Sequence, residues 1–171
     1  MPNCQQNWLR HCRRAACGLT LVEVLVALAI VAILTTLAYP SYASYMTKTR
    51  RIEGQIALLE ALQQQERYFM RNNSYLAFSA ASTEPAERLF RAWSGASAQK
   101  SAYEIDGHAC PGKGIADCVE LRATPGTAQV DGRFKDPECG VLTLDSVGRR
   151  SASGTAGSGA SASGTSATCW P

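Results

Sequence analysis

The sequence predicts an α+β protein in which one long, kinked N-terminal helix packs on a small antiparallel sheet with a C-terminal disulfide loop. Three observations predict this class: an apolar run over residues 19–40, an amphipathic stretch over residues 41–73, and short alternating segments with cysteines in residues 74–171. The charges are nearly balanced, with 17 basic against 14 acidic side chains. The overall charge is therefore no evidence for nucleic-acid binding.

Residues 19–40 are expected to form a membrane-spanning helix. The run from residue 19 to residue 39 would extend roughly 30 Å as a helix, which is the thickness of one bilayer core. Residues 1–18 form a leader that contains arginines and no acid. Because positive charges stay on the cytoplasmic side, we expect the N-terminus in the cytoplasm and the rest of the chain outside the inner membrane.

Glu23 is the unusual residue of the apolar run. A carboxylate inside hydrocarbon costs on the order of 2.5–3.5 kcal/mol at a helix centre and less near an end. Cleavage between Gly18 and Leu19 would create an α-amino group four residues before Glu23, and the amine of a neighbouring subunit could then pair with this carboxylate. An ordinary signal peptide cut after residues 41–43 and an uncleaved anchor are the alternatives.

The helix is expected to continue to residue 71, with a kink at Pro40, because proline removes a backbone hydrogen bond and clashes with the preceding turn. Beyond Pro40, apolar side chains recur at spacings of three and four residues. We expect this stripe to pack on the C-terminal domain. Its members are Ile52, Ile56, Leu59, Leu62 and Phe69.

Residues 74–171 are expected to form a globular domain outside the membrane. Residues 77–100 read as a loop with a possible short helix over residues 86–93. Strands are predicted over residues 101–106, 117–123 and 140–145, where the first two alternate clearly between apolar and polar side chains. Residues 151–168 contain only Ser, Ala, Gly and Thr, which predicts a low-complexity loop.

Four cysteines follow the apolar run, and an even number beyond a membrane segment predicts two disulfides. Three pairings are possible, and spacing favours Cys139 with Cys169 and Cys110 with Cys118. His108 lies close to the second pair, so a metal site is conceivable there. In an oxidising compartment we expect the two thiols to pair instead. We therefore expect no metal, no cofactor and no enzymatic activity.

Two parts of the sequence are similar to a known family. GLTLVEVLVALAIVAIL, residues 18–34, closely resembles the N-terminal signature of type IV prepilins and related pseudopilins. IEGQIALLEALQQQERYFMRNNSY, residues 52–75, resembles the helix of PilE-like minor pilins. CGVLTLDSVGRR, residues 139–150, followed later by Cys169 and Trp170, resembles the C-terminal disulfide loop of the same group.

The resemblance implies a prepilin that a membrane peptidase cuts after Gly18 and N-methylates at Leu19, although most members have Phe at the latter position. Glu23 matches the assembly glutamate of the family. The implied function is that of a minor pilin, a structural subunit of the type IV pilus that serves twitching motility or adhesion. The implied partners are other pilin subunits, the prepilin peptidase and the assembly platform of the inner membrane. The implied location is the inner membrane before assembly and the extracellular pilus, or fimbrium, afterwards.

Two alternatives stay open: a type II secretion pseudopilin, and a pilin that receives DNA for competence. DNA binding would need a basic stripe. Acidic residues are interleaved with the candidate cations in the sequence, which favours an ordinary mixed surface. The candidate DNA contacts are Lys113, Arg122, Arg133, Lys135, Arg149 and Arg150.

Overall fold

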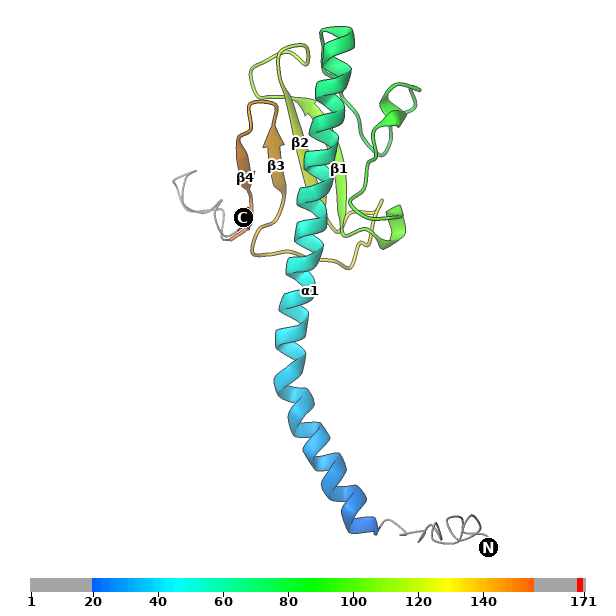
Figure 1. Ribbon diagram of the computed structural model, residues 1–171, viewed down its shortest axis with the longest axis vertical. Helices are drawn as coiled ribbons and strands as arrows, with labels where there is room; N and C mark the ends of the chain where they lie inside the picture. Colours follow the sequence, from blue (N-terminus) through cyan, green and yellow to red (C-terminus); the bar gives the residue numbers. More distant parts are fainter. Residues whose placement is uncertain (1–19, 156–168, 171) are drawn as a thin grey trace, which may run out of the picture. The chain divides into compact units, whose positions relative to one another are not determined.

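The computed structural model describes residues 20–155 and 169–170, and within them it leaves out the side chains of residues 37, 38 and 40. One long helix and four strands make up most of its secondary structure (Figure 1). In chain order, the elements are α1 (Leu21–Asn72), the 3₁₀ helices η1 (Glu87–Leu89) and η2 (Ala98–Lys100), and the strands β1 (Tyr103–Ala109), β2 (Val119–Pro125), β3 (Leu142–Asp145) and β4 (Arg150–Ala152). The chain divides into two compact units, Met1–Ala43 and Ser44–Pro171.

The described part of the first unit is the N-terminal portion of α1. Its large apolar side chains are exposed, from 43% at Val24 to 75% at Leu21. Among the described residues, no single helix is by itself long and apolar enough to cross a membrane. The two helical pieces Leu21–Thr36 and Ser41–Asn72 satisfy that test of length and composition together. The kink at Pro40 stays a prediction.

The second unit, which we call the globular unit, contains one antiparallel sheet with the strand order β1-β2-β3-β4. The C-terminal portion of α1 lies across one face of this sheet (Figure 1). Tyr103, Ile105, Val119 and Leu121 alternate along β1 and β2 and are completely buried. The three predicted strands are confirmed, and each begins two residues later than predicted. Strand β4 was missed, because Arg150–Ala152 shows no apolar alternation.

The predicted contact face of the helix is wrong for three of its five residues. Ile52, Ile56 and Leu59 are 50%, 49% and 39% exposed, although Leu62 and Phe69 do pack against the core. The buried residues of α1 in the globular unit are Arg51, Gly54, Gln55, Ala57, Leu58, Ala61 and Gln65.

Gly54 explains the difference between the predicted and observed faces. A Cβ atom at Gly54 would lie 3.0 Å from a ring carbon of Tyr103, so the helix and β1 are in backbone-to-ring contact. Small side chains at Ala57 and Ala61 continue this close approach. A face of large aliphatic side chains would hold the sheet further away, because protein cores are closely packed.

Candidate functional site

The structure distributes the six candidate DNA contacts over three places. Lys113 and Arg149 belong to the β1–β2 and β3–β4 connections, and Arg150 is the first residue of β4; all three lie at one end of the antiparallel sheet. Arg122 lies in the middle of β2, and Arg133 and Lys135 belong to the β2–β3 connection at the opposite end. At about 3.3 Å per residue, the seven-residue strand β2 separates the two ends by roughly 20 Å. No single stripe contains all six.

The first of these ends, which we call the hairpin end, is held rigid by a disulfide. Cys110 and Cys118 are bonded, with Cα atoms 5.4 Å apart. Across the same loop, the Cys110 amide donates to the carbonyl of Cys118 at 3.2 Å, and the Lys113 amide donates to the carbonyl of Cys110 at 3.0 Å. Gly112 adopts a φ of +74°, which glycine reaches without strain. Lys113 is therefore exposed on a fixed turn.

Asp145 organises the neighbouring turn of the hairpin end. Its carboxylate accepts hydrogen bonds from the amides of Val147 and Arg149 at 3.0 and 2.8 Å and from Nε of Arg149 at 2.6 Å. Ser146 then joins the two turns, because its amide donates to the carbonyl of Val119 at 2.9 Å. The next strand, β4, begins at Arg150.

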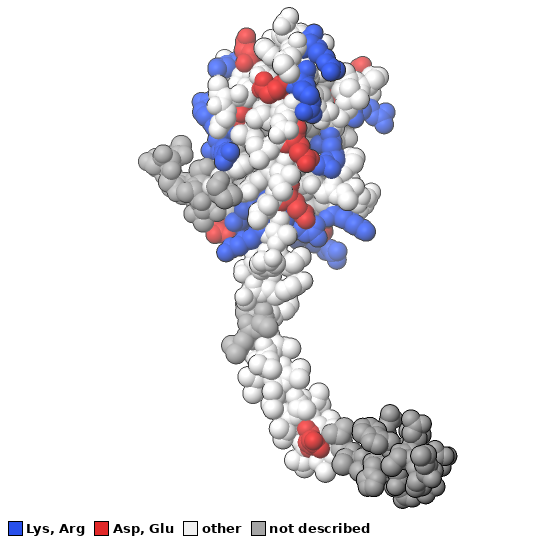
Figure 2. All heavy atoms as spheres, viewed as in Figure 1, with Lys and Arg blue, Asp and Glu red and all other residues white. Residues whose placement is uncertain are grey.

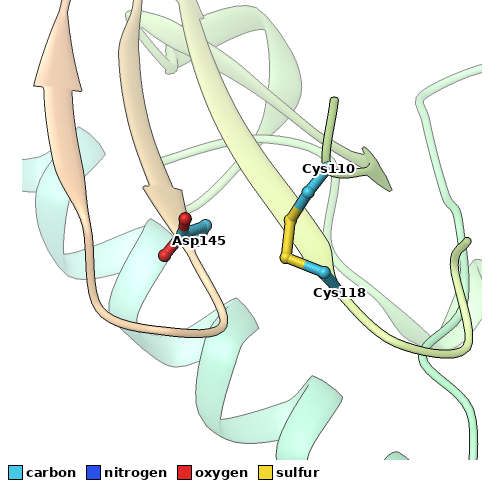
Figure 3. A group of neighbouring side chains, drawn as sticks. All are labelled: Cys110, Cys118 and Asp145. Carbon is cyan, nitrogen blue, oxygen red and sulfur yellow. A yellow bond between two sulfur atoms is a disulfide. The ribbon is translucent and has the colours of Figure 1, made fainter. Parts of the chain in front are cut away.

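Figure 3 shows Asp145 beside the disulfide of Cys110 and Cys118. One ligand-type atom from each of these three residues lies within 4.8 Å of the others. A metal would need thiolates, however, and these sulfurs are bonded to each other. Asp145 already accepts three hydrogen bonds. We therefore interpret this group as structural, because the disulfide and the carboxylate each stabilise one of the two neighbouring turns.

Arg150 is positioned by the C-terminal aromatic residue. Its guanidinium lies 5.4 Å from the ring centroid of Trp170, within cation–π distance, and Trp170 Nε1 donates to the carbonyl of Ser151 at 2.9 Å.

A hollow of about 540 Å³ opens between the two turns. Its lining residues are Pro111, Glu120, Thr143, Asp145, Arg149, Arg150 and Ser151.

The open face of the sheet around Arg122 is acidic. Arg122 Nε donates to Glu120 at 3.1 Å, and the His108 ring lies between Asp106 and Glu120 at 3.0 and 3.3 Å. Burial raises the pKa of Asp106, and the neighbouring His108 and Arg122 oppose that shift. With Glu104 next along β1, carboxylates outnumber the permanent cation here. This face is poorly suited to a phosphate backbone.

The end opposite the hairpin end, which we call the base, contains a buried ion network. Arg51 on α1 donates from Nε and Nη2 to the two carboxylate oxygens of Asp136, both at 2.8 Å, and Nη2 also reaches Glu138 at 2.7 Å. The Tyr103 hydroxyl donates to Asp136 at 2.7 Å. Burial alone would raise the pKa of Asp136, but the hydrogen bonds from Arg51 and Tyr103 outweigh it and lower that pKa. The network fixes the loop of Arg133 and Lys135 against the helix.

The C-terminal disulfide closes the core beside this network. Cys139 and Cys169 are bonded, as expected, with Cα atoms 5.7 Å apart, and both are completely buried. Gln55 on α1 donates its side-chain amide to the carbonyl of Cys169. The disulfide loop is thus attached to the helix as well as to β3.

The processing residues are described only in part. Gly18 and Leu19 lie outside the described residues. Glu23 lies in the first turn of α1, where its amide donates to the hydroxyl of Thr20 at 3.2 Å. Thr20 and Glu23 have the spacing of a helix capping box, a signal that our sequence analysis missed.

Comparisons with known proteins give the following findings. Residues 40–143 match the family described as "Type IV minor pilin ComP, DNA uptake sequence receptor". Residues 13–39 match the prokaryotic N-terminal methylation motif. A solved structure, "High-Resolution Structure of a Type IV Pilin from Shewanella oneidensis", is 27% identical over 61% of this chain and 89% of that one, with a TM-score of 0.39. No curated protein matches the chain.

Proposed function

The chain belongs to the family of the type IV minor pilin ComP, and we propose that it is a pilus subunit that binds duplex DNA through its hairpin end. The family match spans most of the globular unit up to β3 and is the observation that carries this proposal. Pilins are structural proteins anchored in the inner membrane before they join the pilus, and this chain has both the methylation motif and the long helix.

The geometry favours the hairpin end over the rest of the globular unit. Lys113, Arg149 and Arg150 come from two turns that a disulfide, the Asp145 carboxylate and the Trp170 ring hold in place. Preorganised cations lose little conformational entropy when they bind phosphate. The hollow between the turns also offers hydroxyl groups, at Thr143 and Ser151, as hydrogen-bonding groups for a DNA strand.

The test is fluorescence anisotropy of labelled duplex DNA with the mature chain in detergent micelles, at several salt concentrations. We expect the variant K113Q/R149Q/R150Q to bind more weakly and to lower the slope of log K against log salt by up to about three. The variant R133Q/K135Q at the base is the matched control, and we expect it to bind as the wild type does.

Two results would contradict the proposal. Loss of binding in the base variant alone would place the DNA interface at the base. Absence of binding by the wild-type chain would leave a minor pilin without a DNA-receptor function. Melting temperatures of both variants show whether a loss comes from misfolding, and duplexes of scrambled sequence show whether the binding is sequence-specific.

We propose further that the chain matures by cleavage between Gly18 and Leu19 and N-methylation of Leu19, with the N-terminus in the cytoplasm and the globular unit in the periplasm. The match to the methylation motif supports this. In the filament, Glu23 would then pair with the terminal amine of a neighbouring subunit. The exposed side chains of Ile52, Ile56 and Leu59 would pack against other subunits of the pilus.

Mass spectrometry of the unreduced protein from native membranes tests the maturation. We expect an N-methylated Leu19 at the N-terminus and a mass lower than that of the all-thiol form by four hydrogen atoms, two for each disulfide. An intact Met1, or an N-terminus at Ser44, would remove the amine from the vicinity of Glu23 and contradict the proposed pairing.

A further inference from the structure

The base of the globular unit presents a group of cations that the proposed function does not use. Figure 2 shows Lys and Arg side chains gathered along the lower edge of the globular unit. We call this set the basic collar. Its members are Lys48, Arg50, Lys100, Arg133 and Lys135.

Contacts among three segments assemble the collar. Arg50 on α1 donates from Nη1 to the carbonyl of Lys100 at 2.7 Å. The amide of Asp131 donates to the carbonyl of Ser101 at 2.9 Å, which brings the loop of Arg133 to the same place. The ion pair of Arg51 with Asp136, next to Lys135, completes the group.

The acids at the base neutralise only part of the collar. Asp136 and Glu138 are both bound by Arg51, which lies beneath the surface and is not counted in the collar. Glu53 lies 3.6 Å from Arg50, and Asp131 lies 3.6 Å from Arg133. In the part of the chain that the structure describes, no ion pair involves any of the three collar lysines, Lys48, Lys100 and Lys135.

The order of side chains along α1 matches the layers of a bilayer. Apart from Glu23, Thr35 and Thr36, the residues from 21 to 38 are apolar, and three exposed tyrosines follow them at three-residue spacing. Tyr39, Tyr42 and Tyr45 are 76%, 63% and 66% exposed. Tyrosine is enriched at membrane–water interfaces, where the ring contacts acyl chains and the hydroxyl contacts water. Lys48 and the rest of the collar come next.

The distances are short enough for an electrostatic contact. Lys48 follows Tyr39 by no more than about 14 Å of helix. The headgroup layer occupies roughly 5–8 Å of this length. The remaining gap is within about one Debye length, roughly 8 Å at physiological salt.

We propose that the basic collar binds the anionic phospholipid headgroups of the membrane that anchors the chain. Cations near an anionic bilayer surface are attracted to it within a Debye length. The contact holds the base of the globular unit at the membrane while the subunit awaits assembly. The proposal rests on membrane anchoring by residues 19–40 and does not require DNA binding.

The lysines provide the test, because the chain contains only Lys48, Lys100, Lys113 and Lys135. Three belong to the collar, and Lys113 at the hairpin end is an internal control. The mature full chain is placed in nanodiscs of phosphatidylcholine alone or mixed with phosphatidylglycerol, and a water-soluble acylating reagent labels the amines. We expect the collar lysines to react roughly fivefold more slowly in anionic discs. Lys113 should not change, and about 1 M salt should abolish the difference.

A pair of variants separates charge from folding. In K48E/K100E the remaining collar lysine, Lys135, should lose its protection in anionic discs, whereas K113E should leave it protected. Equal reaction rates in both kinds of disc would overturn the proposal. So would slowing of the collar lysines by duplex DNA in neutral discs without any effect of anionic lipid, since the collar would then be a nucleic-acid surface.

Discussion

In an ordinary amphipathic helix the large apolar side chains face the core. In the part of α1 within the globular unit, several large apolar side chains are exposed instead, and polar and small residues are buried. The face on the sheet contains a paired arginine, two glutamines, a glycine and small alanines around Leu58, whereas the face away from the sheet contains Ile52, Ile56 and Leu59. The inner face is held by specific polar bonds and close approach. The outer face mixes these apolar side chains with exposed polar ones, among them Glu60, Gln63 and Arg67.

The largest effect is expected at the ion network of the inner face. Arg51→Met should lower the free energy of unfolding by about 3–5 kcal/mol, because Asp136 would stay buried without its partner. Urea unfolding of the mature chain in detergent measures this. Arg50→Met is the matched control: it removes the more exposed pair with Glu53 and the bond to the Lys100 carbonyl, and we expect it to cost clearly less, about 1–2 kcal/mol.

The contribution of the Arg51–Asp136 pair to stability should depend on pH. Since the pKa of Asp136 is lowered in the folded protein, its pairing stabilises the wild type above the ordinary aspartate pKa of about 3.9 and is lost as the pH falls through the lowered value. The deficit of Arg51→Met should therefore shrink in acid. A deficit that is constant from neutral pH to below the ordinary pKa would show that packing, rather than charge, is responsible.

A smaller effect is expected at Gln65. Its completely buried amide donates from Nε2 to the carbonyl of Leu76 at 2.6 Å and accepts from the amide of Leu76 at 3.0 Å. Gln65→Leu keeps the volume but leaves two backbone groups unsatisfied, at a cost of about 2–4 kcal/mol in unfolding free energy. The exposed Gln63→Leu serves as the control. Equal stability of the two variants would refute the role of these bonds.

The close approach of α1 to Tyr103 can be tested at Gly54. Alanine favours a helix by about 1 kcal/mol over glycine, but its Cβ would lie 3.0 Å from the Tyr103 ring. That ring is buried and bonded to Asp136, so it has little freedom to move. We expect Gly54→Ala to cost about 1–3 kcal/mol in a melting experiment. If Gly54→Ala is instead more stable than the wild type, the Tyr103 ring and the sheet can move away from the added methyl group at little cost.

The smallest effect on folding is expected at the outer face. Ile56→Ser should change the unfolding free energy by no more than about 0.5 kcal/mol, because the side chain is 49% exposed. Its incorporation into pili, measured by immunoblotting of sheared filaments, should nevertheless fall. Gln63→Ser is the control. Normal incorporation of Ile56→Ser would show that this face is not a subunit contact.

Much of the fold could be predicted because its signals are local. The apolar run, the alternation in β1 and β2, and the spacing of the cysteines each depend on residues close in sequence. The two disulfides and the antiparallel sheet followed from them. Strand β4 could not be predicted in this way, because Arg150–Ala152 is a strand only through its pairing with β3.

The candidate site was harder to predict for the same reason. The sequence supplied six cations, but only the topology assigned Lys113, Arg149 and Arg150 to one end of the sheet. Of the acids interleaved in the sequence, Asp136 and Glu138 are bound by Arg51, whereas Asp131 pairs with the candidate cation Arg133. The order of acidic and basic residues along the chain therefore did not predict which charges stand next to each other on the surface.

By itself, the sequence determined the apolar run over residues 19–40, the N-terminal methylation motif, the strand periodicity and the oxidised cysteines, because these follow from local composition and spacing. Only the tertiary structure decided which face of α1 meets the sheet and which cations stand together. Helical periodicity defines a set of faces, but the close approach at Gly54 and the buried ion pair of Arg51 select one of them.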